Sequence, residues 1–150
     1  VLVHGDKLAG ILVELLPMRG RPPAAVIGIG LNLRLPADAV VPDQAGVADL
    51  AGALGGEPPS RPALLAAILG EFHRLFETYA AAGFPALRGA WEQRNAFADL
   101  PVAVRGESAT LYGTCIGVDD DGALLLRGED GIQRVLAGDV SLRPLMDGPR

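Results

Sequence analysis

The sequence contains a single cysteine, Cys115, among its 150 residues, and lysine and arginine together number only 13. One cysteine excludes an internal disulfide framework and is typical of a reducing compartment, so we expect a cytoplasmic location. The net charge of −5 argues against nucleic-acid binding through this chain, because neutralising phosphates requires clustered basic residues. No apolar run reaches the ~20 residues that a membrane-spanning helix requires, and no signal peptide is visible, so we expect no membrane partner.

Other absences concern the start of the chain and its chemistry. The sequence begins without methionine on Val1-Leu2-Val3, a segment typical of a strand end, so we expect earlier members of a sheet upstream. His4 and His73 lack further histidines or cysteines at metal-ligand spacing, which argues against a metal cage. The run Gly28–Leu33 begins like a dinucleotide-binding fingerprint, but leucine replaces its third glycine and no helix is predicted to begin there.

Hydrophobic residues make up 49% of the chain, enough for a sizeable core. Two apolar runs, Leu8–Leu16 and Ala24–Leu33, are predicted to be strands that face each other across a polar, proline-rich connection. His4-Gly5-Asp6 supplies the small and polar residues of a tight turn before the first of them. Val47–Leu54 is predicted to form a short helix ending at two glycines. The residues from Arg34 to that helix are predicted to be a long surface loop.

The clearest helix begins at Ser60, a suitable N-cap, with Pro62 in the first turn, where proline is tolerated. Apolar residues then recur at three- and four-residue spacing as far as Gly83. Phe84–Ala96 is predicted to be a second helix. We expect both helices to cover a sheet, and we assign them no chemistry.

From Asp99 onward, short β-rich runs alternate with turns that contain glycine and aspartate. Five such runs within about 45 residues predict a small barrel. Cys115 lies in one of these runs beside apolar residues, which favours a packed thiol over a nucleophile. The predicted domains are therefore residues 1–98 and 99–146, followed by a tail at 147–150.

Two polar residues of the first hairpin each allow a structural and a functional interpretation. Lys7 is either a solvated lysine at a strand start or a cation aimed at a carboxylate or phosphate. The nearby Gly10, which lacks a Cβ, would allow a ligand to lie against the strand. Asn32 is either a turn residue that ends a strand or a hydrogen-bonding group for phosphate or a hydrated metal. The residues alone therefore indicate a sheet with a candidate anion site.

The stretch Lys7–Glu14, KLAGILVE, resembles the KxAGILxE motif of biotin–protein ligases, the family that includes the bacterial biotin operon repressor. Val26–Leu33, VIGIGLNL, is similar to that family's VxGxGxN strand. Trp91-Glu92 and the segments 116–126 and 138–143 continue the likeness in the order of the family's C-terminal half. The resemblance implies an α+β fold. Its parts would be a partial class II synthetase-like mixed sheet with covering helices and a small SH3-like β-barrel.

The resemblance also implies a ligase that uses ATP, Mg²⁺ and biotin. Biotinoyl-5′-AMP would form first, and biotin would then pass to a lysine of a biotin carboxyl carrier protein. By the match, Lys7 is the catalytic residue, at the biotin carboxyl or adenylate phosphate. The biotin-binding residues are Lys7, Gly10, Leu12 and Gly30. The nucleotide-binding residues are Gly28, Gly30, Asn32 and Arg34, with Asn32 also expected to contact Mg²⁺.

Some family features are not matched. The family's glycine- and arginine-rich loop and its WPND motif lie upstream of the KxAGIL strand, and Arg19-Gly20-Arg21 only imitates the first. The loop Arg34–Gly46 corresponds to the segment that orders over the adenosine but lacks the family's tryptophan. We therefore expect the C-terminal portion of a ligase, fully active only with an upstream part. The alternatives are a non-catalytic binding or dimerisation module, forming a homodimer through a sheet edge, and a lipoate ligase-like protein.

Overall fold

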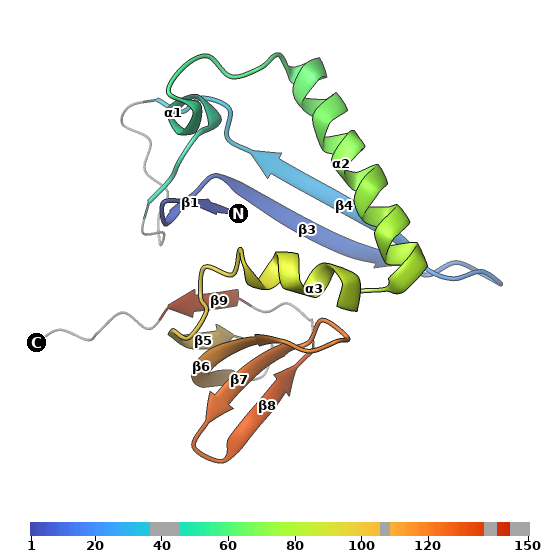
Figure 1. The fold of residues 1–150 in the computed structure, drawn as a ribbon, viewed down its shortest axis with the longest axis vertical. Helices are drawn as coiled ribbons and strands as arrows, with labels where there is room; N and C mark the ends of the chain where they lie inside the picture. The colour runs from blue at the N-terminus through green and yellow to red at the C-terminus, as the bar shows by residue number, and fades with distance from the viewer. Residues whose placement is uncertain (37–45, 106–108, 137–140, 145–150) are drawn as a thin grey trace, which may run out of the picture. The chain divides into compact units, whose positions relative to one another are not determined.

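The computed structural model describes residues 1–36, 46–105 and 109–136 and the backbone of 141–144. Strands and helices follow one another as β1–β4, α1–α3 and β5–β9, so the predicted α+β class is confirmed (Figure 1). The chain divides into two compact units, Val1–Leu65 and Ala66–Arg150. Most of the predicted loop Arg34–Gly46 and the predicted tail at 147–150 lie outside the described residues.

The first unit opens on a small antiparallel hairpin of β1 (Leu2–Val3) and β2 (Asp6–Lys7). Its two connecting residues, His4 and Gly5, have φ angles of 51° and 90°. Positive φ at both central positions is what a type I′ turn requires, and the twist of that turn suits a two-residue hairpin. The predicted tight turn is confirmed, and it places Lys7 at the end of β2.

A longer hairpin follows, formed by β3 (Ala9–Leu16) and β4 (Ala24–Leu31), which pair antiparallel without a register shift (Figure 1). The pairing confirms the prediction that these two apolar runs face each other. Ile11, Val13 and Ile29 share one face of this two-stranded sheet, and all three side chains are exposed. An exposed apolar face of this kind is a surface that a further element or chain can cover.

The short helix α1 (Leu50–Leu54) begins at Asp49, whose carboxylate accepts a hydrogen bond from the Gly52 amide at 2.7 Å. It ends at Gly55, which takes the left-handed conformation with φ 68°. The predicted start at Val47 was therefore wrong by three residues, because Asp49 caps the helix. Val47 instead forms an isolated parallel bridge with Lys7.

Helix α2 (Arg61–Ala82) starts after Ser60, whose hydroxyl accepts a hydrogen bond from the Ala63 amide at 3.4 Å, and it is followed by Gly83 with φ 68°. The predicted helix and its cap are confirmed. No residue of α2 is buried, and several residues of its apolar stripe, such as Leu69 and Phe76, are exposed. The predicted covering of a sheet by this helix stays a prediction. No described helix is long and apolar enough to cross a membrane.

Helix α3 (Pro85–Glu92) ends four residues before the predicted end at Ala96. The reason is local, because the Asn95 side chain accepts a hydrogen bond from the Phe97 amide at 3.0 Å. An asparagine that bonds the backbone two residues ahead forms a turn that competes with the helix. Asn95 also donates to the Cys115 sulfur at 3.6 Å, so this turn lies beside the following sheet.

The second unit contains a five-stranded antiparallel sheet in the order β8-β7-β6-β5-β9 (Figure 1). Its strands are β5 (Pro101–Arg105), β6 (Thr110–Val118), β7 (Leu124–Gly128), β8 (Gly131–Val135) and β9 (Ser141–Pro144). The five predicted strands are thus confirmed, whereas their closure into a barrel stays a prediction. The core consists of Val102, Val104, Cys115 and Leu126, all almost fully buried, so the cysteine is packed as predicted.

Charged residues connect the turn between β6 and β7 to its neighbours. Arg134 of β8 forms ion pairs with Asp119 and Asp121, and the partner guanidinium holds the pKa of the Asp119 carboxyl below its ordinary value. Arg88 of α3 bonds Asp120 at 2.9 Å, which ties this helix to the same turn. Asp119 is half-buried and the other charged side chains are exposed, so each ion pair contributes little by itself.

Candidate functional site

Four of the predicted site residues lie on one face of the β3–β4 hairpin. Gly10 stands opposite Gly30 and Leu12 stands opposite Gly28. Side chains alternate between the two faces of a strand, so these four positions share one face. Leu12, which is 59% exposed, therefore has glycines opposite it and on one side along this face, and the pair Glu14 and Val26 on the other side. The result is a strip of accessible backbone with one apolar side chain in it, which we call the glycine face.

Neither backbone conformation nor packing explains these three glycines. None of them has a positive φ. Among the described residues, a methyl group on Gly30 would meet no atom within 4 Å. A methyl group on Gly28 would lie 3.8 Å from the Leu12 carbonyl oxygen, and one on Gly10 would lie 4.0 Å from Cε of Lys7. The remaining physical reason for glycine inside a strand is close approach by a ligand or another backbone.

Lys7 extends its side chain toward the same face, because its Cε lies beside Gly10. Its backbone is held on both sides: the Lys7 amide donates to the Gly46 carbonyl at 3.0 Å, and the Lys7 carbonyl accepts from Ala48 at 3.0 Å. No ion pair of Lys7 is found among the residues that the structure describes. A cation over a strip of bare backbone is a suitable place for a carboxylate or phosphate.

Asn32 lies just after β4, is half-buried, and donates both of its side-chain hydrogens to backbone. Its Nδ2 donates to the Lys7 carbonyl at 3.2 Å and to the Ala48 carbonyl at 3.0 Å. The structure therefore brings Asn32 next to Lys7, as expected of a shared site. One interpretation of the sequence was that Asn32 donates a hydrogen bond directly to a phosphate. Such a bond needs a side-chain N–H group, and Nδ2 already donates to these two backbone carbonyls.

Arg34 forms an ion pair with Glu57 at 2.7 Å, in which the two side chains are 58% and 87% exposed. Both residues line an open hollow of about 560 Å³ beside α1, together with residues such as Asp49. An exposed pair of this kind is weak and readily exchanged for another partner. An anion could therefore bind Arg34 if it displaced the Glu57 carboxylate.

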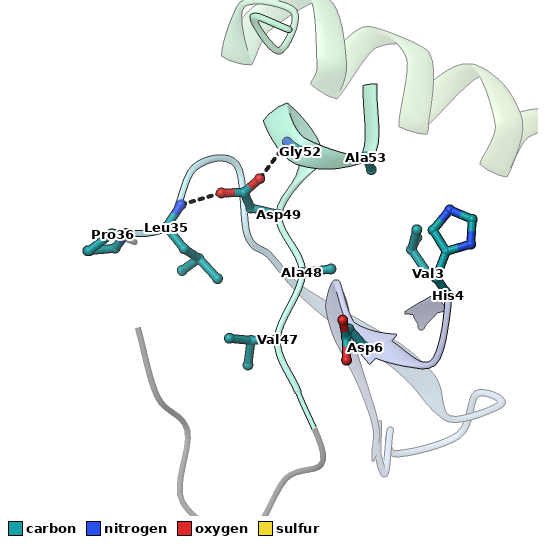
Figure 2. Close-up of a pocket in the computed structure, with 10 residues that line it drawn as sticks. All are labelled: Val3, His4, Asp6, Leu35, Pro36, Val47, Ala48, Asp49, Gly52 and Ala53. Atoms are coloured by element: carbon teal, nitrogen blue, oxygen red, sulfur yellow. Dashed lines mark hydrogen bonds between the residues drawn. The ribbon is translucent and has the colours of Figure 1, made fainter. Parts of the chain in front are cut away.

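A second hollow, of about 400 Å³, lies between the β1–β2 hairpin and the start of α1 (Figure 2). His4 and Asp6 come from the hairpin, and Asp49 comes from the cap of α1. The Asp49 carboxylate accepts hydrogen bonds from Gly52 and, at 2.6 Å, from the Leu35 amide, and these amides lower its pKa. Two carboxylates make this hollow unfavourable for phosphate, in contrast to the surroundings of Lys7.

Sequence reasoning missed Asp49, which fixes both α1 and the backbone of Leu35. The available signal was an aspartate directly before a short apolar helix, a usual N-cap pattern. Among the described residues, no group of three or more histidine, cysteine, aspartate or glutamate side chains is placed to hold a metal ion.

Comparison with known proteins supplies the context for this geometry. Residues 101–143 match the family model "Biotin protein ligase C terminal domain". The chain is 35% identical over 144 residues to the biotin–[acetyl-CoA-carboxylase] ligase of Paracoccus denitrificans, covering 93% of this chain and 59% of that protein. It is 32% identical over 146 residues to the bifunctional ligase/repressor BirA of Bacillus subtilis, covering 95% of this chain and 44% of that protein.

The chain matches the C-terminal portion of biotin–protein ligases. The resemblance predicted from the KxAGILxE and VxGxGxN motifs is confirmed. The chain spans about half the length of the curated biotin–protein ligases it matches.

The fold agrees with that of solved biotin–protein ligases. The structure of the Aquifex aeolicus ligase in complex with biotin and ATP superposes with a TM-score of 0.77 at 22% identity, over 95% of this chain and 58% of that one. At this level of identity, the superposition shows the fold alone. The roles of Lys7, the glycine face, Asn32 and Arg34 therefore stay predictions.

Proposed function

We propose that this chain is the C-terminal, adenylate-proximal part of a biotin–protein ligase. In the first step a biotin carboxylate oxygen attacks the α-phosphorus of ATP, forming biotinoyl-5′-AMP and releasing pyrophosphate. In the second step the amine of a carrier lysine attacks the acyl carbon, an amide forms, and AMP leaves. Biotin and ATP are the ligands, and biotin carboxyl carrier proteins are the partners.

The observation that carries the proposal is the position of Lys7 beside the glycine face. Its ammonium would neutralise the carboxylate of biotin before the first step and the phosphate of the adenylate after it. Gly10, Gly30 and Leu12 would form the floor under biotin, since their face is open and partly apolar. Gly28 would lie by the nucleotide.

Two polar residues would serve the nucleotide. Arg34 would exchange Glu57 for a phosphate, because its present ion pair is exposed. Asn32 retains its Oδ1 as an acceptor, which fits a single neutral oxygen ligand for Mg²⁺. Magnesium keeps several waters and uses phosphate oxygens, so one protein oxygen suffices. When bound, the ion would neutralise charge on the departing pyrophosphate.

The proposal includes the two predicted domains, residues 1–98 and 99–146. Residues 1–98 would supply one wall of a class II synthetase-like catalytic domain. Residues 99–146 would form an SH3-like barrel, supported by the five-stranded antiparallel sheet. An upstream part would complete the pocket.

Transfer of carbon-14 biotin to an acceptor carrier domain tests the proposal. The assay is run with this chain alone and with this chain joined to the unmatched part of the Paracoccus denitrificans ligase. We expect transfer by the joined protein and little by the chain alone. Absence of transfer by both would overturn the enzymatic proposal, provided that the intact Paracoccus ligase is active in parallel.

A non-catalytic dimerisation module is the second candidate. It is supported by the β3–β4 sheet, which has only two strands in the described chain and thus unpaired edges beside exposed apolar residues. Unpaired edges favour strand addition by another copy. Calorimetry with biotin and biotinoyl-adenylate, combined with sedimentation, separates the candidates: dimerisation at micromolar concentration without ligand binding would favour this one.

A further inference from the structure

We infer that Asn32 is a positioning residue whose side chain holds the backbone of Lys7 against the segment Gly46–Asp49. The inference rests on the proposed function only in assigning Lys7 to biotin. The positioning itself follows from the hydrogen bonds of the described residues. It differs from a role in which Asn32 contacts phosphate.

The orientation of the Asn32 carboxamide follows from its partners. Nδ2 lies 3.2 Å from the Lys7 carbonyl oxygen and 3.0 Å from the Ala48 carbonyl oxygen. Carbonyl oxygens only accept hydrogen bonds, so the nitrogen end must face them and the oxygen end must point elsewhere. A primary amide has two N–H groups, and both are committed. Asn32 therefore has no side-chain donor left for a phosphate oxygen.

The backbone of Asn32 extends this connection. Its amide donates to the Leu8 carbonyl at 3.0 Å, and its carbonyl accepts from the Leu50 amide at 2.9 Å. Asn32 thus joins the residue before β3, the end of β2 and the first residue of α1. Asn32, which is half-buried, thus takes part in four hydrogen bonds, of which it donates three and accepts one, and it is the junction of this unit.

The Lys7 carbonyl receives two of the bonds at this junction, one from Asn32 and one from the Ala48 amide. The backbone of Lys7 sets the direction in which its side chain leaves the strand, and Cε of Lys7 lies beside Gly10 in this arrangement. Loss of the Asn32 side-chain bonds would leave the Ala48 carbonyl without this partner and Lys7 with one fewer constraint. The ammonium would then lose its fixed place over the glycine face.

Asn32→Asp and Asn32→Ala test the inference, because aspartate keeps the acceptor oxygens and shape but loses both donors. Amide hydrogen exchange is measured at Ala48 and Lys7, with Val104 as an internal reference in the second unit. Biotin affinity is measured by calorimetry without nucleotide or magnesium. Gln93→Glu, which adds the same charge at an exposed position, is the control.

We expect both variants to exchange at least tenfold faster at Ala48 and to bind biotin at least tenfold more weakly, with aspartate no better than alanine. Unchanged exchange in both variants would overturn the inference. So would an aspartate variant with the exchange and affinity of the original protein, or faster exchange with unaltered biotin affinity. If the chain joined to the unmatched part of the Paracoccus denitrificans ligase binds no biotin, the proposed function fails, whereas the exchange measurement still decides the positioning.

Discussion

Gly30→Ala separates a glycine retained for a ligand from a glycine retained for the fold. A methyl group at this position would meet no atom within 4 Å among the described residues, and its backbone has no positive φ. Alanine in a strand costs less conformational entropy than glycine, so we expect the free energy of unfolding to rise by about 0.5–1 kcal/mol. The same methyl group would occupy the space assigned to biotin beside Leu12. Overpacking of this kind costs roughly 1–3 kcal/mol, so biotin should bind about ten- to a hundredfold more weakly.

Gly30→Ala should therefore make the fold more stable and biotin binding weaker, so a general loss of structure cannot explain the result. Urea unfolding measures the free energy of unfolding, and calorimetry measures the affinity for biotin. Gly70→Ala is the matched control, since a methyl group there in α2 also meets no described atom within 4 Å. It should stabilise the protein and leave biotin binding unchanged. A Gly30→Ala protein that binds biotin as the original does would refute the assignment of the glycine face.

Three further predictions concern other parts of the chain. Leu126→Ala should lower the free energy of unfolding by about 2–5 kcal/mol in a urea titration, because Leu126 is only 1% exposed in the core of the second unit. Asp119 has a lowered pKa, so its stabilising bond with Arg134 is complete above the ordinary value of 3.8 and is lost as the pH falls through the folded-state pKa. The difference in melting temperature between the original protein and Asp119→Asn should therefore shrink below about pH 4. Glu57→Gln should strengthen ATP binding by about fivefold or less by freeing Arg34, and weaker binding would contradict the proposed role of that arginine.

Features encoded by nearby residues could be predicted from the sequence. Apolar runs bounded by turn residues predicted β3, β4 and the five strands of the second unit, because turns depend on the residues within them. The end of α1 followed from Gly55, which takes the left-handed conformation that glycine tolerates. The motifs placed Lys7, Gly10 and Asn32 in one site, and the structure brings the three together.

Features that depend on distant partners could not be predicted. The pairing of Arg34 with Glu57 joins residues far apart in the sequence, and no local pattern indicates it. The direct facing of Gly10 and Gly30 depends on the register of the hairpin, which the motif spacing does not specify. The committed donors of Asn32 depend on Ala48, which approaches only after the chain has folded back.

The location of biotin on the glycine face is the central claim, and titration of the ¹⁵N-labelled chain with biotin tests it most directly. The account predicts saturable shifts of the amide signals of Gly10, Leu12, Gly28 and Gly30. Lys7→Met should weaken these shifts because it removes the cation beside the face. Shifts confined to the hollow around Asp49, or to the sheet of the second unit, would contradict the account.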